Sequence, residues 1–342
     1  MKLSLCLATY NEEKNLGQCL ESVKDIVDEI IVVDGSSTDR TLEIAKKYGA
    51  KVISTSNKKN FHINKQMALD KANGEWILQL DADERVSPQL SREIKKVIEM
   101  GSEELEKYQK NLRNRELFLR HQAIIENLRV EDRKSKIELE DRSLQIDNPA
   151  SSFNNQNPLS TINPQSSNFT AFYLPRLNYF LGKPLRYGGV YPDGVIRLVK
   201  KGKARFPCKS IHELMAVDGK TGWLQNNLLH YDSPTFKRYI ERNNRYISMM
   251  ADELTIKMTN KKLKMLHVTC YTLHEGFRWL FIKPIFWFIM TTFRHKGILD
   301  GWRGIVFSFF SALRFPRAFI RYLILSRHVH FIGNTAVDGN QS

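Results

Sequence analysis

The residues best suited to chemistry are three carboxylates within four positions, Asp81, Asp83 and Glu84, at the end of an apolar run. Side by side at the edge of a sheet, such carboxylates repel one another unless a cation lies between them. A divalent cation with a substrate diphosphate would relieve that repulsion, since Mg²⁺ is usually held by one or two carboxylates plus phosphate oxygens. A solvated acidic turn is the alternative, because this short pattern is common by chance.

A further candidate is Asp34, which ends a second apolar run, residues 29–34. The segment that follows, Gly35-Ser36-Ser37-Thr38-Asp39-Arg40-Thr41, has the composition of a turn into a helix, whose free N–H groups can meet a ligand. A carboxylate at this place can accept the imide N–H of a uracil ring. A helix-capping aspartate is the alternative.

Four short apolar or β-branched runs are expected to position these groups, and the stretches between them carry helical spacing. They cover residues 3–8, 29–34, 51–55 and 75–81. The alternation predicts an α/β fold, with a mostly parallel sheet and helices on both faces. Ligands bind such sheets at the carboxyl ends of the strands. The segments expected at that edge are Thr9-Tyr10-Asn11, Asp34-Gly35-Ser36 and Asp81-Ala82-Asp83-Glu84.

Beyond residue 100 the sequence changes character. Residues 101–169 begin with charged helix formers and end in a tract rich in Asn, Ser, Gln and Pro, which predicts a solvated helix or helical hairpin and then a flexible linker. Strand patterns resume after residue 170. They lead to a helix entered through Ser233-Pro234, with Ser233 as its N-cap and Pro234 at its first position.

Composition narrows the class of protein. The 342 residues are 42% hydrophobic and 26% charged, with a net charge of +15 and a mean hydropathy of −0.39. These values exclude a small disulfide-stapled scaffold, a wholly disordered chain and a polytopic membrane protein. Residues 1–169 hold 25 basic and 27 acidic side chains, whereas residues 170–342 hold 27 and 10. This asymmetry indicates a polyanionic partner, either nucleic acid or an anionic membrane.

The C-terminal part is aromatic, apolar and basic at once. Its longest uncharged stretch, residues 284–293, is much shorter than the roughly 20 residues that cross a bilayer. Residues 263–326 therefore predict a pair of amphipathic helices in a membrane interface. An ordinary C-terminal core is the alternative explanation for the same aromatics.

The cysteines and the N-terminus indicate a reducing compartment. Cys6, Cys19, Cys208 and Cys270 are far apart and form no C-x-x-C pair, so neither a disulfide framework nor a zinc site is expected. The apolar run at residues 3–8 is too short for a signal peptide. We therefore expect the protein in the cytoplasm, peripheral on the inner face of the cell membrane.

The motifs occur together in a known order. The chain resembles the family 2 glycosyltransferases, inverting enzymes with the nucleotide-diphospho-sugar fold called GT-A, in LATYNEEKNLGQCLESV, DEIIVVDGSSTDRTLEIA and ANGEWILQLDADERV. It resembles the subgroup of lipopolysaccharide inner-core glucosyltransferases in YLPRLNYFLGKPLRYGGVYPDGVIRLVKKGKARF, IHE, LLHY and NRY. The resemblance covers nearly all of the chain outside residues 101–169.

The resemblance implies roles for individual residues. It assigns a Mg²⁺ or Mn²⁺ ion to the D-x-D pair, with Asp83 in direct contact and Asp81 nearby. The implied contacts with the nucleotide sugar come from Thr9, Tyr10, Glu12, Asp34, Lys65 and Asp81. Many relatives have a second aspartate where this chain has Gly35, so the nucleobase contact depends on Asp34 alone.

An inverting transfer needs a base on the acceptor side, opposite the leaving diphosphate. Glu213 is the preferred candidate, because it matches the H-E position of the subgroup. Asp193 in Tyr191-Pro192-Asp193-Gly194 is the rival, although this sequence is also typical of a turn. His212, His230 and Arg197 are weaker candidates, since hydrogen-bonded structural roles explain them equally well.

The resemblance implies transfer of a sugar from a nucleotide diphosphate, such as a UDP-hexose, to a hydroxyl of a lipid-linked or lipopolysaccharide-core glycan. No nucleic acid partner is expected. The implied parts are a nucleotide-sugar-binding half (1–100), the insert and linker (101–169), an acceptor-side half (170–254), membrane-associating helices (255–330) and a tail (331–342). The alternatives are a nucleotidyltransferase of related fold and an inactive RNA-binding or membrane-adaptor protein.

Overall fold

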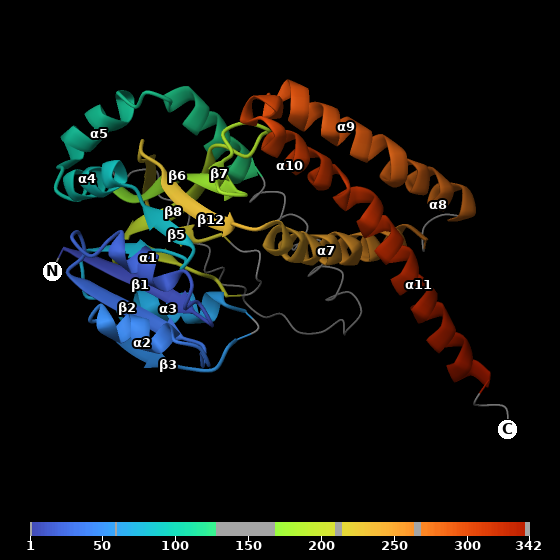
Figure 1. Ribbon diagram of the computed structural model, residues 1–342, viewed down its shortest axis with the longest axis horizontal. Helices are drawn as coiled ribbons and strands as arrows, with labels where there is room; N and C mark the ends of the chain where they lie inside the picture. Colours follow the sequence, from blue (N-terminus) through green and yellow to red (C-terminus); the bar gives the residue numbers. More distant parts are fainter. Residues whose placement is uncertain (1, 59, 128–167, 209–213, 263–267, 339–342) are drawn as a thin grey trace, which may run out of the picture. The chain divides into compact units, whose positions relative to one another are not determined.

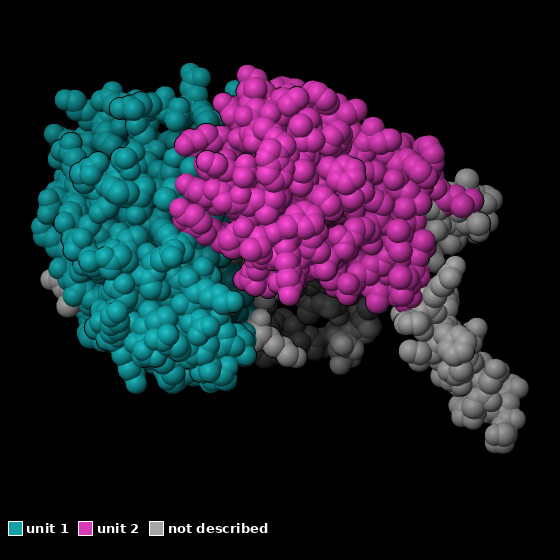
Figure 2. Space-filling model, viewed as in Figure 1, with its two compact units in different colours: residues 1–177, 192–230 teal, residues 178–191, 231–342 magenta. Residues whose placement is uncertain are grey.

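The computed structural model describes residues 2–58, 60–127, 168–208, 214–262 and 268–338. Two compact units make up the chain (Figure 2), Met1–Leu177 with Pro192–His230 and Asn178–Tyr191 with Tyr231–Ser342. Two predicted site residues, His212 and Glu213, lie outside the described residues, as does most of the expected linker.

The first unit alternates strands and helices along its N-terminal part and then continues mainly with strands (Figure 1). Two of its strands, β6 and β12, run on into residues of the second unit. The elements are β1 (Leu3–Thr9), α1 (Leu16–Glu21), β2 (Glu29–Asp34), α2 (Thr41–Lys47), β3 (Lys51–Ser54), α3 (His62–Asp70), β4 (Trp76–Gln79), β5 (Glu84–Val86), α4 (Pro88–Val97), α5 (Ser102–Lys110), β6 (Phe169–Phe180), β8 (Asp193–Lys200), β9 (Ala204–Arg205), β10 (Ala216–Val217), β11 (Lys220–Trp223) and β12 (Leu228–Ser233).

Within the described residues, ten strands form one sheet with the order β3-β2-β1-β4-β8-β6-β12-β5, and β11 and β7 pair with β6. The strands β3, β2, β1 and β4 are parallel to their neighbours. Beyond β4 the pairing is mainly antiparallel, because β8 is antiparallel to β4, β6 to β8, and β5 to β12, whereas β11 is parallel to β6. The predicted α/β class is confirmed, with the parallel part supplied by the N-terminal strands.

The helices cover both faces of the parallel strands, as the sequence predicts. Along β1 the side chains alternate, since successive residues of a strand point to opposite faces. Leu3, Leu5 and Leu7 pack with α1, α2 and α4, whereas Cys6 packs with α3 on the other face. All four side chains are fully buried, so both layers are closed over the sheet.

The insert is helical at its start, in α5 and again at residues 115–127, and most of its side chains there are exposed, as expected for a solvated helical segment. Three of them, Leu105, Leu112 and Phe118, are buried in the first unit. The Phe118 ring stacks on Trp223 with 4.6 Å between centroids, and the Gln109 side chain bonds both backbone groups of Trp223 at 2.8 and 2.9 Å. Only one side of this segment therefore adds to the core, since Leu117, Leu119 and Ile124 are 41%, 44% and 51% exposed.

The second unit is mainly helical. Its long helix α7 begins after Thr235, whose Oγ1 accepts the backbone N–H of Arg238 at 3.3 Å, while Ser233 still belongs to β12. The predicted N-cap at Ser233 is therefore wrong by two residues, because the strand continues through it. The elements are β7 (Lys183–Pro184), α7 (Phe236–Lys262), α8 (Val268–Phe277), η1 (Arg278–Ile282), α9 (Lys283–Ile289), η2 (Met290–Arg294), η3 (Gly297–Asp300), α10 (Trp302–Ala312) and α11 (Arg314–Asp338).

Candidate active site

The turn between β4 and β5 presents the acidic motif at the carboxyl edge of the sheet. Glu84 N–H donates to the Asp81 carbonyl at 2.9 Å, and Asp81 N–H donates to the Glu84 carboxylate at 3.0 Å. Ala82 is 4% exposed and packs in the core, whereas the side chains of Asp81 and Asp83 stay 30% and 26% exposed. The small residue between the two aspartates lets the turn lie against the core while both carboxylates face outward.

Asp81 is held by two cations of the protein. Its Oδ1 lies 2.5 Å from Lys65 Nζ, and its Oδ2 lies 2.6 Å from Arg197 Nη2. Burial alone would raise the pKa of Asp81, but Arg197 and Lys65 hold that pKa well below its ordinary value. Both oxygens of Asp81 are therefore engaged by protein groups, and Lys65 lies at the acidic turn.

Glu84 turns inward, unlike the outward position expected from the sequence. It is fully buried, and its Oε1 lies 2.7 Å from Arg197 Nη2 and 3.4 Å from Arg176 Nη1. Arg197 also bonds the Gln79 side chain. Burial by itself would lower the pKa of Arg197, yet Asp81 and Glu84 raise it, so the guanidinium is a permanent cation. A buried arginine and a partly exposed one thus relieve much of the repulsion that the acidic motif predicts.

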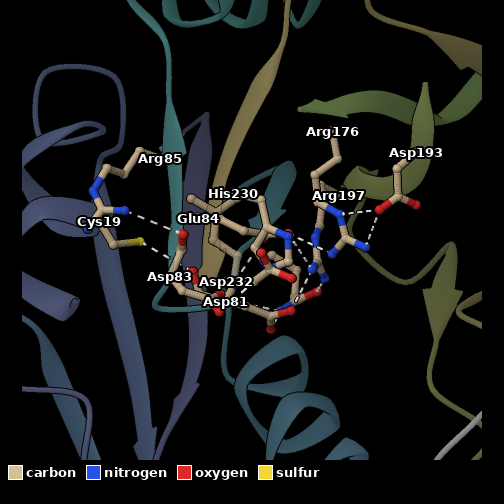
Figure 3. Close-up of polar contacts among 12 residues, drawn as sticks. Cys19, Asp81, Asp83, Glu84, Arg85, Arg176, Asp193, Arg197, His230 and Asp232 are labelled. Atoms are coloured by element: carbon tan, nitrogen blue, oxygen red, sulfur yellow. Dashed lines mark hydrogen bonds and ion pairs between the residues drawn. The ribbon is translucent and has the colours of Figure 1, made fainter. Parts of the chain in front are cut away.

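Asp193 and Arg176 face each other across β8 and β6, where they are register partners. Arg176 donates from Nε and Nη2 to Asp193 Oδ2, at 2.9 and 2.6 Å. The Asp193 side chain remains 34% exposed. The arginine therefore fixes the orientation of a carboxylate that still has access to solvent (Figure 3).

Asp83 is paired with His230, which reaches the turn from β12. His230 Nε2 lies 3.5 Å from Asp83 Oδ2, and the histidine side chain is 12% exposed. Burial would raise the pKa of Asp83, but the bond to His230 lowers it, so the carboxylate is ionised at neutral pH. The register explains the encounter, because His230 lies opposite Glu84 in the pairing of β12 with β5.

The side chains at this edge fit a divalent cation that takes its remaining ligands from a substrate. In the part of the chain that the structure describes, no group of three or more His, Cys, Asp or Glu side chains is arranged to hold a metal ion. Asp83 and His230 offer one carboxylate and one imidazole, and Mg²⁺ or Mn²⁺ completes such a set with phosphate oxygens and water. Asp81, with both oxygens engaged by protein cations, is less suited to direct coordination.

The charges at this edge nearly balance. Four carboxylates, those of Asp81, Asp83, Glu84 and Asp193, meet the cations of Lys65, Arg176 and Arg197, and the Arg85 guanidinium bonds the Asp83 carbonyl at 3.5 Å. A divalent cation beside Asp83 would make the cluster net positive, and a diphosphate would then balance it.

Asp34, predicted to contact a nucleobase, is fully buried at the end of β2. Its Oδ1 accepts hydrogen bonds from Thr9 Oγ1 at 3.0 Å and Ser37 Oγ at 2.6 Å, and its Oδ2 accepts Ser37 N–H at 2.8 Å. Gly35 N–H donates to the Thr9 carbonyl at 2.8 Å. Asp34 and Thr9 thus join the loops after β1 and β2. Asp34 does not cap α2, whose N-cap residue is Arg40.

The loop after β1 is also fixed to the loop after β2 by its backbone. Asn11 has a positive φ of 54°, and its side-chain oxygen accepts Thr38 N–H at 2.9 Å. Glu12 N–H donates to Thr41 Oγ1 at 2.8 Å. Tyr10 is 46% exposed, so its ring is available for stacking on a planar ligand.

The sequence analysis missed three features of this edge. Arg176 was not considered, Glu84 was expected to point outward, and His230 was not matched to Asp83. All three depend on the pairing of β6, β8 and β12, whose register brings together residues more than 90 positions apart. A basic residue within an otherwise apolar strand, as at Arg176 and Arg197, is the one local pattern that indicates a buried ion pair.

Comparison with known proteins finds sequence matches for the N-terminal part of the chain. The sequence profile of glycosyl transferase family 2 matches residues 4–152. An uncharacterized glycosyltransferase of Rickettsia typhi is 43% identical over 93 residues, 27% of this chain and 32% of that protein. A TPR repeat-containing protein of Synechococcus elongatus is 46% identical over 85 residues, 25% of this chain and 21% of that protein. The matched segment thus spans a third or less of these relatives.

Among solved structures, that of S. aureus TarS with UDP-GlcNAc is similar at 32% identity and a TM-score of 0.26, covering 28% of this chain and 30% of that chain. Glucosyl-3-phosphoglycerate synthase of Mycobacterium tuberculosis, solved with Mn²⁺, UDP and glucosyl-3-phosphoglycerate, has 26% identity and a TM-score of 0.23, covering 24% and 34%. By its sequence match, the N-terminal part of the chain, residues 4–152, is similar to glycosyl transferase family 2.

Proposed function

We propose that the protein is an inverting, metal-dependent glycosyltransferase that uses a nucleotide diphosphate sugar, with UDP-hexose as the first candidate donor. The observation that supports this best is the pair Asp83 and His230, partly exposed at the carboxyl edge of the sheet beside the clamped Asp81. Partly exposed carboxylates at such an edge suit a divalent cation bridging to a diphosphate.

The donor would bind along the loops that follow β1 and β2. Tyr10 would stack on the base, and Thr9, Glu12 and Asp34 would shape the pocket for the nucleoside, either by direct contact or by holding the loops together. Lys65, 8% exposed, would meet the diphosphate at the acidic turn, where it already neutralises Asp81.

The metal would be held by Asp83 and His230. Mg²⁺ or Mn²⁺ bound there would act as a Lewis acid that stabilises the charge on the departing nucleoside diphosphate. Arg197 and Arg176 hold the surrounding carboxylates in place. This gives the chain a fixed electrostatic environment for a leaving group that gains negative charge.

The acceptor hydroxyl needs a base, and Glu213 remains our assignment. Asp193 is the rival, and its Oδ2 is fixed by both Arg176 nitrogens while its side chain stays partly exposed. The base takes the hydroxyl proton as the acceptor oxygen attacks the anomeric carbon, and the bond to the diphosphate breaks on the opposite side.

The acceptor that we propose is a lipid-linked or lipopolysaccharide-core glycan, which places the reaction at the inner face of the cell membrane. The support is the resemblance to the inner-core subgroup and the concentration of basic residues in the C-terminal half.

Thermal unfolding in the presence of nucleotides tests the donor and the metal together. The panel is UDP, GDP, CMP and UDP-sugars, each with Mn²⁺, Mg²⁺ or a chelator. We expect one nucleoside diphosphate to raise the melting temperature only with metal, since a ligand that binds the native state alone stabilises it. Asp83→Ala should lose the metal-dependent part of the shift.

A folded protein that responds to none of these ligands would contradict the proposal and favour the inactive RNA-binding or adaptor alternative. Release of pyrophosphate from a nucleoside triphosphate, instead of nucleoside diphosphate from a sugar donor, would favour the nucleotidyltransferase.

A further inference from the structure

The second unit carries an exposed apolar stripe along one helical run. The run is continuous from residue 268 to residue 294 through α8, η1, α9 and η2. Every fourth residue in it is a large apolar side chain between 49% and 71% exposed. We call these residues the apolar stripe: Leu273, Phe277, Phe281, Ile285, Ile289 and Phe293.

The two π-helical turns help to keep the stripe on one side of the run. In a regular α-helix a spacing of four residues advances about 40° beyond one turn, so a stripe at that spacing winds around the helix. A π turn holds more residues, because it bonds residue i to i+5. The turns η1 and η2 span the intervals from Phe277 to Phe281 and from Ile289 to Phe293, where they reduce the winding.

The inward side of this run packs within the second unit. Trp279 is 8% exposed in an apolar cluster with residues of α7 and α11, and Thr291 and Thr292 are at most 4% exposed. The stripe is therefore a second set of large apolar side chains, which faces outward. Because a water-soluble helix pair ordinarily keeps such a contiguous set buried, its exposure indicates that the stripe meets an apolar phase.

A second set of exposed apolar residues adjoins the stripe. Phe309 of α10 is 48% exposed, and its ring meets Phe288 of α9 edge to face, with 6.4 Å between centroids. Through this contact the apolar surface continues from α9 onto α10. The further exposed residues of η3 and α10 are Ile298, Leu299, Trp302 and Ile305.

The charges around this surface are mostly positive. Residues 268–326 contain eight Lys and Arg residues and two acidic residues, Asp300 and the buried Glu275. Lys283 Nζ lies 3.4 Å from the centre of the Trp279 ring, and the Arg303 guanidinium lies 4.5 Å from that of Trp302. Cations stacked on aromatic rings are typical of side chains at a lipid headgroup boundary.

Two other occupants fit these observations less well. A second copy of the same surface would bring like charges together, which is unfavourable. A membrane span is not available, since in the part of the chain that the structure describes no helix is sufficiently long and apolar to cross a bilayer. A helix pair lying in the plane of an anionic membrane would bury the apolar residues and bring the cations close to the lipid phosphates.

We propose that the apolar stripe and the exposed residues of α10 insert into the headgroup region of a bilayer rich in anionic phospholipids, with the flanking lysines and arginines at the phosphates. The inference concerns only the second unit and does not depend on the glycosyltransferase chemistry. It names the residues that would make the membrane contact expected from the sequence.

Flotation with lipid vesicles tests this inference on the full chain without donor or acceptor. The vesicles contain phosphatidylethanolamine and phosphatidylglycerol, or phosphatidylcholine alone as the neutral comparison. The stripe variant combines Phe281→Glu with Ile285→Glu. The matched control combines Leu119→Glu with Ile124→Glu, which changes two side chains that are 44% and 51% exposed in the first unit.

We expect the stripe variant to lose at least tenfold in partitioning to anionic vesicles and the control to bind like the unchanged protein. Raising the salt concentration should weaken binding only in part, because the apolar contribution is not screened. Tryptophan fluorescence gives a second readout, since Trp302 should be quenched by lipids brominated in the upper acyl chain.

Equal binding by the stripe variant and the unchanged protein would overturn the proposal, as would absence of binding by the unchanged protein. A dimer in lipid-free solution that becomes monomeric in the stripe variant would assign the surface to a protein interface instead. Thermal unfolding of both variants verifies that they are folded. Because no donor is present, failure here leaves the proposed transferase reaction untouched.

Discussion

The two ends of the parallel strands treat buried carboxylates differently. At the amino end of β2, Glu29 is 3% exposed and accepts bonds from Ser4 Oγ and Asn73 N–H, both at 2.5 Å, and from Lys51 Nζ at 3.0 Å. Burial alone would raise the pKa of Glu29, but these bonds lower it to about 2. At the carboxyl end, Asp81 and Asp83 stay partly exposed.

The difference shows that carboxylates at the two ends of the same strands have different roles. Glu29 connects the starts of β1 and β2 to the segment before β4, so its charge stabilises the sheet. The partners of Asp81 are one arginine and one lysine, and Asp83 is left accessible beside His230. We therefore expect substitutions at the amino end to change stability and those at the accessible carboxyl end to change turnover.

The largest expected effect is that of Asp83→Ala on turnover. Loss of the exposed carboxylate removes the group that we assign to the metal, so kcat should fall by roughly 10³-fold or more. Stability should change little, because the side chain is 26% exposed. Initial rates with saturating donor and metal, together with urea unfolding, measure both quantities.

Asp218→Ala is the matched control for that variant, since Asp218 forms an exposed ion pair with Arg205. It should retain both turnover and stability. Activity of Asp83→Ala within tenfold of the unchanged protein would remove this residue from the mechanism.

Arg197→Met tests whether the buried ion pairs at the carboxyl end of the strands stabilise the fold, in addition to the accessible residues that we assign to turnover. The change leaves Glu84 buried without its closest cation, so the free energy of unfolding should fall by about 3–5 kcal/mol. Arg205→Met, on the surface, should cost less than about 1 kcal/mol. Equal urea midpoints for these two variants would show that the buried ion network contributes no stability.

Glu29→Gln tests the amino end. A folded-state pKa of about 2, below the ordinary 4.5, means that the charge stabilises the fold above about pH 5 and that this stability is lost as the pH falls. The shift corresponds to about 3 kcal/mol at pH 7. The variant should lose stability of that order and show a weaker decline between pH 7 and pH 3.5, with turnover at pH 7 unchanged while it is folded. An unaltered pH profile of unfolding would refute this assignment.

The smallest expected effect distinguishes the two candidate bases. Glu213→Gln should keep donor binding and lower turnover by roughly 10²-fold. Asp193→Asn should have the weaker effect on turnover, since Arg176 engages this carboxylate. The reverse order in single-turnover measurements would transfer the role of base to Asp193.

Much of the first unit could be predicted from local patterns. The β-branched runs, the helical spacing between them and the turn at Asp81 and Asp83 each reflect the geometry of a few consecutive residues. The same reasoning failed at Ser233, because strand pairing extended β12 past a residue with the chemistry of a cap. It also missed the core role of Phe118, whose partner Trp223 is remote in sequence.

The sequence by itself determined the α/β class, the order of the strands along the chain, the acidic motif at a strand end and the basic, aromatic character of the C-terminal helices. Only the tertiary structure decided that Glu84 faces inward, that Arg176 fixes Asp193, that His230 meets Asp83 and that the apolar stripe is exposed. The physical reason is that periodicity reports which residues of one element share a face. The partner of that face is selected by strand register and helix packing between residues far apart in the chain.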